Sequence, residues 1–287
     1  TVMTAGYFGS KGTHLIGTYE LNEVPAGKAL ASLCAVGTST TPTVPCQNPG
    51  AAFTSTANTA ILDQIRPYRG YRSIAIITPQ FNSNYNSLQI SAQRRFTGAS
   101  QLGLAYTWAK NLTDNQTDRS TAPQNSYNNK GDYGRATLDR RPVLTFSYIY
   151  ELPFHRGQHD LAGKLLGGWQ VSGLALYRSG LPFTAVTSSF DAAGLGLVPA
   201  LVAGARPNVL CDPNANAPHT LQQYFNTGCF TPNPTVTTTG VNNVIGNAGR
   251  GVINGPTTTR FDFTLAKNIR LGETMKVQLR AEAFNVL

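Results

Sequence analysis

The sequence predicts an all-β fold, an antiparallel up-and-down meander that forms part of a transmembrane β-barrel with long extracellular loops. Several segments alternate with a period of two residues, and their second face is small or polar rather than charged. Charged residues make up 13% of the chain, about half of the share typical of soluble domains. The connections between the predicted strands alternate between short and long, which places every long loop at one end of the meander.

The clearest unit is the hairpin predicted over residues 84–110, NYNSLQISAQRRFTGASQLGLAYTWAK. Each half alternates, and residues 97–100 supply a polar turn between the two strands. The apolar face of the second strand carries Leu102, Leu104, Tyr106 and Trp108, and the polar face of the first strand carries Gln89, Ser91 and Gln93. We expect the apolar face to contact lipid and the polar face to line a wet lumen.

The same pattern, followed along the chain, predicts further strands. Strands are expected at residues 1–9, 13–24, 84–96, 101–110, 141–152, 168–179, 259–271 and 275–287. Short turns are expected at residues 10–12, 97–100 and 272–274, with a medium turn at 153–166. Residues 74–80 are either a strand extension or a strand within a loop. Long loops are predicted at residues 25–72, 111–139 and 180–258, and connections of this length are usually functional, disordered or displayed at the surface.

The later strands continue the two-faced pattern. Their apolar faces add Phe146, Tyr148, Phe261 and Phe263 to the predicted lipid-facing residues, and the last strand directs Lys276, Gln278, Arg280 and Glu282 toward the lumen. A soluble β-sandwich would bury such an apolar face under a second sheet, and this alternative stays open. The membrane setting is favoured because aromatic residues lie near the strand ends, where outer-membrane barrels carry aromatic girdles.

The formal net charge of +9 permits nucleic acid or acidic lipid as partners. The Lys and Arg residues are scattered, however, and form only doublets such as Arg94-Arg95 and Arg140-Arg141. Nucleic-acid binding is therefore not expected, since the sequence has no basic stripe or basic helix. The longest apolar runs fall far short of the ~20 residues that a spanning helix needs.

The four cysteines fall into two local pairs, Cys34 with Cys46 and Cys211 with Cys229. Both pairs lie in Pro- and Thr-rich sequence without a His at ligand spacing, so loop disulfides in an oxidising compartment are favoured over a zinc site. Of the three possible pairings, 34–46 with 211–229 is preferred because each bond closes a short loop. Free thiols are the alternative.

Several segments together resemble a known family. These segments are YNSLQISAQRRF, YTWAKNLTD, DRRPVLTFSYIYELPF, GGWQVSG with YRSGLPFT, and RFDFTLAKNIRL with LRAEAFN. They look like the C-terminal barrel of TonB-dependent outer-membrane receptors, and are most similar to the Oar-like branch, whose members often carry a carboxypeptidase-regulatory-like domain at the N-terminus. The resemblance covers most strand segments and says little about the long loops.

The resemblance implies a protein of the outer membrane of a Gram-negative bacterium. It implies a 22-stranded barrel with an N-terminal plug, which moves a bulky ligand inward with energy from an inner-membrane complex. The implied partners are outer-membrane lipid, the plug, the energising complex and a ligand whose identity the sequence leaves open. We expect a fragment of such a barrel, roughly a third of it, because no plug, TonB-contacting segment or final strand with a terminal aromatic is recognised.

No catalytic or cofactor-binding constellation stands out, so we expect a protein that is not an enzyme and uses no cofactor. A soluble hydrolase built from Ser179, Asp191 and His219 is a distant alternative, because nothing in the local sequence activates these residues. Two function classes remain: an energy-coupled receptor or transporter, and a non-transporting surface module for binding or adhesion.

Metal sites are less favoured than solvated loops. A calcium site would draw on the carboxylates of one loop, which are Asp114, Asp118, Asp132 and Asp139. These residues lack the spacing of an EF-hand. A second possibility combines His155, His159 and Asp160 in a predicted turn, where ordinary solvation is the default.

Overall fold

The computed structural model describes residues 1–26, 63–96, 98–116, 122–155, 158, 160–187, 195, 204–231, 245–272 and 275–286. Its main element is one antiparallel sheet in which the long strands follow one another in the order β1-β2-β3-β5-β6-β11-β12. The predicted fold class, an antiparallel meander, is therefore confirmed. The sheet is not closed, and β1 and β12 form its two edges in the described part of the chain.

The long strands differ in length, and the first two are the longest. They are β1 (Val2–Glu20), β2 (Ala75–Arg95), β3 (Gln101–Thr113), β5 (Pro142–Glu151), β6 (Trp169–Arg178), β11 (Thr258–Arg270) and β12 (Lys276–Ala283). The extension of β2 back to Ala75 shows that residues 75–80 belong to this strand and not to a separate loop strand. In the same way β3 continues to Thr113, beyond its predicted end at residue 110.

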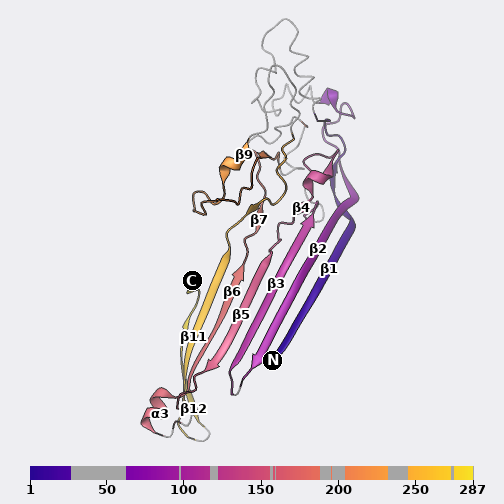
Figure 1. The fold of residues 1–287 in the computed structure, drawn as a ribbon. Coiled ribbons are helices and arrows are strands. Elements are labelled where there is room, and N and C mark those ends of the chain that lie inside the picture. Colours follow the sequence, from indigo (N-terminus) through magenta and orange to yellow (C-terminus); the bar gives the residue numbers. More distant parts are fainter. Residues whose placement is uncertain are drawn as a thin grey trace.

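The long connections gather at one end of the sheet and the short ones at the other, as Figure 1 shows. We call the first end the loop end and the second the turn end. Short elements of the loop end are η2 (Asn129–Asp132), β4 (Gly134–Arg135), β7 (Pro182–Phe183), β8 (Asn208–Val209), η3 (Thr227–Cys229), β9 (Phe230–Thr231) and β10 (Ile253–Asn254). There β4 pairs with β3, β7 with β10, and β8 with β9. The helix α3 (Leu161–Leu166) lies at the turn end.

The prediction of two strands at residues 1–9 and 13–24, with a turn at 10–12, is wrong. One strand runs through this segment, and Ser10, Lys11 and Gly12 pair with residues of β2. The register shifts between Gly12 and Ile16 mark a β-bulge, and His14 there has a φ of 57°. A bulge inserts an extra residue without ending the ladder, and its small and left-handed residues resemble those of a turn. The N-terminus consequently lies at the turn end, beside the connection between β2 and β3 (Figure 1).

None of the described helices combines the length and the apolar character needed to cross a membrane.

The well-buried side chains are concentrated at the loop end. Phe81 is 1% exposed and lies against the backbone of Gly17, where β1 and β2 extend beyond the bulge. Asn115 donates from its side chain to the Ile16 carbonyl at 2.8 Å, which ties the end of β3 to the same place. A Cβ on Gly17 would lie 2.5 Å from the Phe81 ring and 2.6 Å from Asn115 Nδ2. This glycine therefore permits a contact that joins three strands.

We predict that Gly17→Ala destabilises the loop end by about 1–3 kcal/mol, because the added methyl overpacks a filled site. Gly9→Ala on the same strand is the matched control, since its Cβ would make only ordinary contacts of 3.4 Å or more. Thermal unfolding in detergent measures both variants. Equal transition temperatures for the two variants would contradict the packing argument.

Candidate functional site at the loop end and on the polar face

The register of the sheet sorts the strand residues onto two chemically different faces. Residues that pair directly in an antiparallel ladder share a face, and the register joins Leu102 to Tyr148 and Leu104 to Phe146. The eight residues predicted to face lipid lie on one face: Leu102, Leu104, Tyr106, Trp108, Phe146, Tyr148, Phe261 and Phe263. The seven predicted lumen residues lie on the other: Gln89, Ser91, Gln93, Lys276, Gln278, Arg280 and Glu282. Their contact with lipid or with water stays a prediction.

The apolar face carries an uncharged band with basic residues at its margins. Below the bulge, the charged residues on this face of the described strands are Lys11 and Lys110 toward the loop end, and Arg94 and Lys267 toward the turn end. From Asn86 to Arg94, β2 contributes nine residues to this band. A tilted strand of an outer-membrane barrel needs about 9–11 residues to cross the bilayer. The margins are thus spaced as a tilted crossing strand requires.

The turn-end margin is built around Lys267. This residue is 6% exposed, and its ammonium donates to the backbone carbonyls of Leu165, at 2.9 Å, and of Gly167, at the C-terminal end of α3. The ring of Trp169 lies 5.1 Å from the Lys267 nitrogen. A cation is favoured at the end of a helix, where carbonyls lack partners. Lys267 therefore fastens α3 against the edge of the apolar band.

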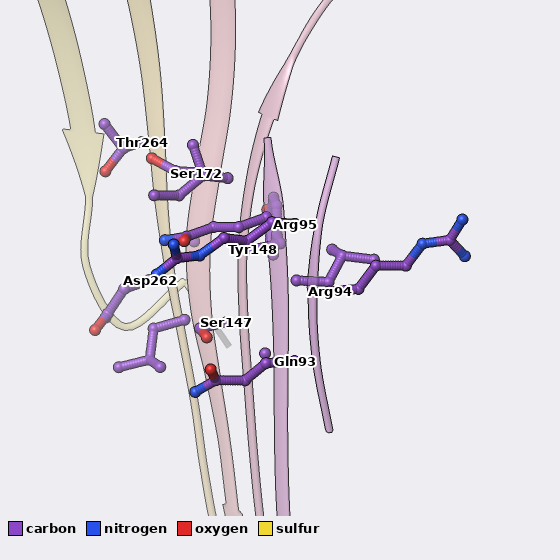
Figure 2. Close-up of a pocket in the computed structure, with 14 residues that line it drawn as sticks. Gln93, Arg94, Arg95, Ser147, Tyr148, Ser172, Asp262 and Thr264 are labelled. Carbon is purple, nitrogen blue, oxygen red and sulfur yellow. The ribbon is translucent and has the colours of Figure 1, made fainter. Parts of the chain in front are cut away.

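The polar face is hollowed near the turn end. This hollow, of about 460 Å³, spans β2, β3, β5, β6 and β11. Figure 2 shows Gln93 and Arg95 on the side of the hollow and Arg94 pointing away from it. Arg260 Nε contacts Asp262 at 3.0 Å on the same face. Polar and charged side chains on the hollowed side are what a water-filled interior requires.

At the loop end, two buried aspartates each contact two arginines. Asp132 is 1% exposed, and its Oδ1 accepts from Arg206 Nη1 at 2.9 Å and from Arg250 Nε at 2.8 Å. Asp139 contacts Arg135 Nε at 2.7 Å and Arg141 Nε at 3.5 Å. Its second oxygen accepts from the backbone N–H of Asn111 at 2.8 Å. These six residues, Asp132, Asp139, Arg135, Arg141, Arg206 and Arg250, are called the arginine cluster below.

A second set of polar contacts holds the neighbouring connections together. The side chain of Asn22 donates to the carbonyls of Tyr68, Tyr71 and Arg72 at 2.9–3.0 Å. The Glu23 carboxylate accepts from the backbone N–H of Ser126 at 2.6 Å. Burial and the nearby Glu23 carboxylate raise the pKa of the Tyr127 hydroxyl. The loop end is thus a structured cluster in its described part, although the sequence pattern offered no periodic signal for it.

One of the two predicted disulfides is present in the structure. Cys211 and Cys229 are bonded, with a Cα–Cα distance of 5.0 Å, and Cys229 is fully buried. The bond lies beside the β8–β9 pair, so it closes a small separate unit at the loop end. Cys34 and Cys46 lie outside the described residues.

The predicted calcium site does not form among the residues that are described. Asp132 and Asp139 contact arginines, and Asp114 accepts from the backbone N–H of Asn82 at 2.7 Å. Asp118 lies outside the described residues. No group of three His, Cys, Asp or Glu residues that could hold a metal occurs in the described part. Sequence reasoning did not anticipate that Asp132 and Asp139 would each pair with two arginines.

The residues of the other weak candidates also have structural roles or lie elsewhere. Asp160 accepts from the Gly163 N–H at 2.7 Å and caps α3, and His159 is not described. Ser179 Oγ accepts from the backbone N–H of Arg141 at 2.9 Å, while His219 packs edge-on against Tyr224. Asp191 is likewise outside the described residues.

The whole chain, residues 1–287, matches the family model described as outer membrane beta barrel domain. Searches of the curated proteins and of the solved structures found no significant match.

We predict that an arginine placed on the apolar face costs more than one placed on the polar face of the same strand. Leu104→Arg is expected to lower the free energy of unfolding in a bilayer by about 2–4 kcal/mol. Ala105→Arg is expected to change it little, because the side chain at position 105 points to the opposite face. Urea unfolding in lipid vesicles measures the free energy of unfolding of both variants. Equal costs would show that the apolar face does not contact lipid.

We also predict that the Cys211–Cys229 bond stabilises the β8–β9 unit by about 2–4 kcal/mol, as expected for a loop of this length. The double variant Cys211→Ser with Cys229→Ser is expected to be cleaved faster by protease between residues 211 and 229. Cleavage sites at the turn end serve as the internal control. An unchanged cleavage rate within this segment contradicts the prediction.

Proposed function

The chain belongs to the outer membrane beta barrel domain family, and on this premise we propose that it is part of an energy-coupled outer-membrane receptor. In this proposal the loop end captures a bulky ligand and the polar face conducts it inward. The family places the chain among proteins of the outer membrane. Ligand capture, transport and energy coupling are our proposal. The arginine cluster is the observation that carries it.

The loop end supports capture because it is built from buried charges and not from apolar packing alone. Buried ion pairs contribute little net stability compared with apolar residues of similar volume. A cluster of shared carboxylates and arginines is therefore better explained by a binding role. The cluster lies at the loop end, where a ligand from outside the cell would first contact the protein under this proposal (Figure 1).

The polar face supports conduction. It continues along the sheet from the loop end to the hollow near the turn end, where Gln93, Arg95 and Asp262 lie (Figure 2). A plug inside the barrel and an energising complex of the inner membrane would supply the gating and the energy. We further propose that the protein acts by binding and not by catalysis.

A non-transporting surface module is the second candidate, because a structured loop end would suffice for binding without passage. Depletion of compounds from the medium distinguishes the two. Mass spectrometry compares cells with and without the gene, each with and without an uncoupler of the proton gradient. We expect at least one compound to be taken up only by cells that carry the gene, and only while the gradient is intact.

The control is surface retention at low temperature, which reports binding alone. A compound that is retained in the presence of uncoupler, without ever entering the cell, supports the surface module and contradicts transport. A monodisperse monomer without detergent would contradict the integral-membrane receptor and favour the surface module.

A further inference from the structure

A pocket of about 270 Å³ lies beside the arginine cluster at the loop end. Its wall includes three arginines of the cluster, Asp132, and two further polar residues. These wall residues are Gln124, Asp132, Arg135, Thr184, Arg206 and Arg250. Ligand pockets for drug-sized molecules usually begin near 300 Å³. The volume therefore suits one small group, such as the end of a larger ligand.

The charges around the pocket do not balance. Three largely buried guanidinium groups, Arg135, Arg206 and Arg250, share the carboxylates of Asp132 and Asp139, which leaves a net charge of +1 among the buried groups of the described cluster. The Arg206 and Arg250 side chains are only 5% and 10% exposed. Burying charge without a partner is costly. An anionic group in the pocket would offset this excess.

The donors around the pocket are not fully used by the protein. Within the described part, the only hydrogen bond of the Arg250 side chain is that of Nε to Asp132, so its terminal nitrogens remain available. Arg206 Nε is buried without a partner. Thr184 Oγ1 accepts from the Gly251 N–H at 3.0 Å, which leaves its hydroxyl hydrogen free to donate. The planar end of an arginine suits a carboxylate, which it can bind through two parallel hydrogen bonds.

Gln124 indicates that the ligand also carries a donor. Its side chain is 2% exposed, and neither its oxygen nor its nitrogen has a hydrogen-bond partner. Its backbone N–H is held by Asp132 Oδ2 at 3.1 Å, which fixes the residue at the pocket wall. A buried amide left unpaired is costly. The amide nitrogen can donate to an anion, whereas the amide oxygen needs a donor such as a hydroxyl.

We propose that this pocket binds a hydroxycarboxylate group, that is, a carboxylate with a neighbouring hydroxyl, at the end of a larger ligand. Arg250 and Arg206 bind the carboxylate, and Gln124 bridges the carboxylate and the hydroxyl. This inference rests on the proposed receptor function and names the chemical class that the receptor recognises.

Binding of small probes to the purified full chain in detergent tests the proposal. Glucuronate carries both groups, glucose lacks the carboxylate, and acetate lacks the hydroxyl. Saturation-transfer NMR with competition is expected to show glucuronate bound at least tenfold more tightly than glucose or acetate. Equal binding of acetate or inorganic phosphate overturns the hydroxycarboxylate assignment, and so does tighter binding of N-acetylglycine, which would indicate a peptide carboxylate. Absence of glucuronate binding also overturns it.

A charge substitution separates this role from a structural one. Gln124→Glu keeps the side-chain size and supplies a carboxylate to the positive cluster from within the protein. We expect it to weaken glucuronate binding roughly 10- to 100-fold and to raise the unfolding temperature by roughly 2–5 °C. Gln222→Glu makes the same change at an exposed loop-end position and is the control. A lower unfolding temperature, or unchanged glucuronate binding, overturns the proposal.

The two proposals fail in different ways. If gradient-dependent uptake is found but glucuronate does not bind, the pocket assignment is wrong and the transport proposal stands. If glucuronate binds and no gene-dependent uptake is found, the pocket assignment stands and transport is wrong.

Discussion

The continuous ladder of backbone hydrogen bonds from β1 to β12 is the constraint on which the rest of this structure depends. In a membrane interior no water is present to satisfy an N–H or C=O group, so a spanning chain must pair its backbone with itself. The meander achieves this by placing each long strand beside the next along the chain. Because the backbone is satisfied by its neighbours, each face of the sheet is free to take the chemistry of its own surroundings. The two edges, β1 and β12, are where this pairing is incomplete in the described chain, and barrel closure requires that both acquire partners.

The loop end follows a different principle from the sheet below it. Its contacts are ion pairs and side-chain hydrogen bonds to backbone, and a fully buried carboxylate, that of Asp132, organises three of them. Such a network specifies one arrangement of its connections, since each unmade hydrogen bond is costly in a buried place. The same feature makes it responsive to charge. Under the proposed function, an anion that enters the pocket would change the charge balance of the whole cluster.

The sheet could be predicted from sequence largely because period-two alternation is a local signal. The alternation alone predicts the shared apolar face of Leu102, Leu104, Tyr106 and Trp108, because it depends only on neighbouring residues. The bulge between Gly12 and Ile16 was misread because Ser-Lys-Gly has the composition of a turn, and only the length of β2 shows that pairing continues past it. The arginine cluster could not be predicted, because it brings together Asp132, Arg206 and Arg250, which lie 74 and 118 positions apart from the aspartate. No local pattern reports a contact made by irregular chain.

The bulge has a consequence for how the molecule can vary. It lies where β1 and β2 pass from the uncharged band into their loop-end extension, so the two strands below and above it form separate stretches of one ladder. The lower stretch lies in the apolar band, whereas the upper stretch sets the height of the loop end above that band. Inserting two residues into each strand above the bulge would raise the loop end by about 7 Å and keep every side chain on its original face. The extension of β1 and β2 above the bulge can therefore change in length while the apolar band below it keeps the same length.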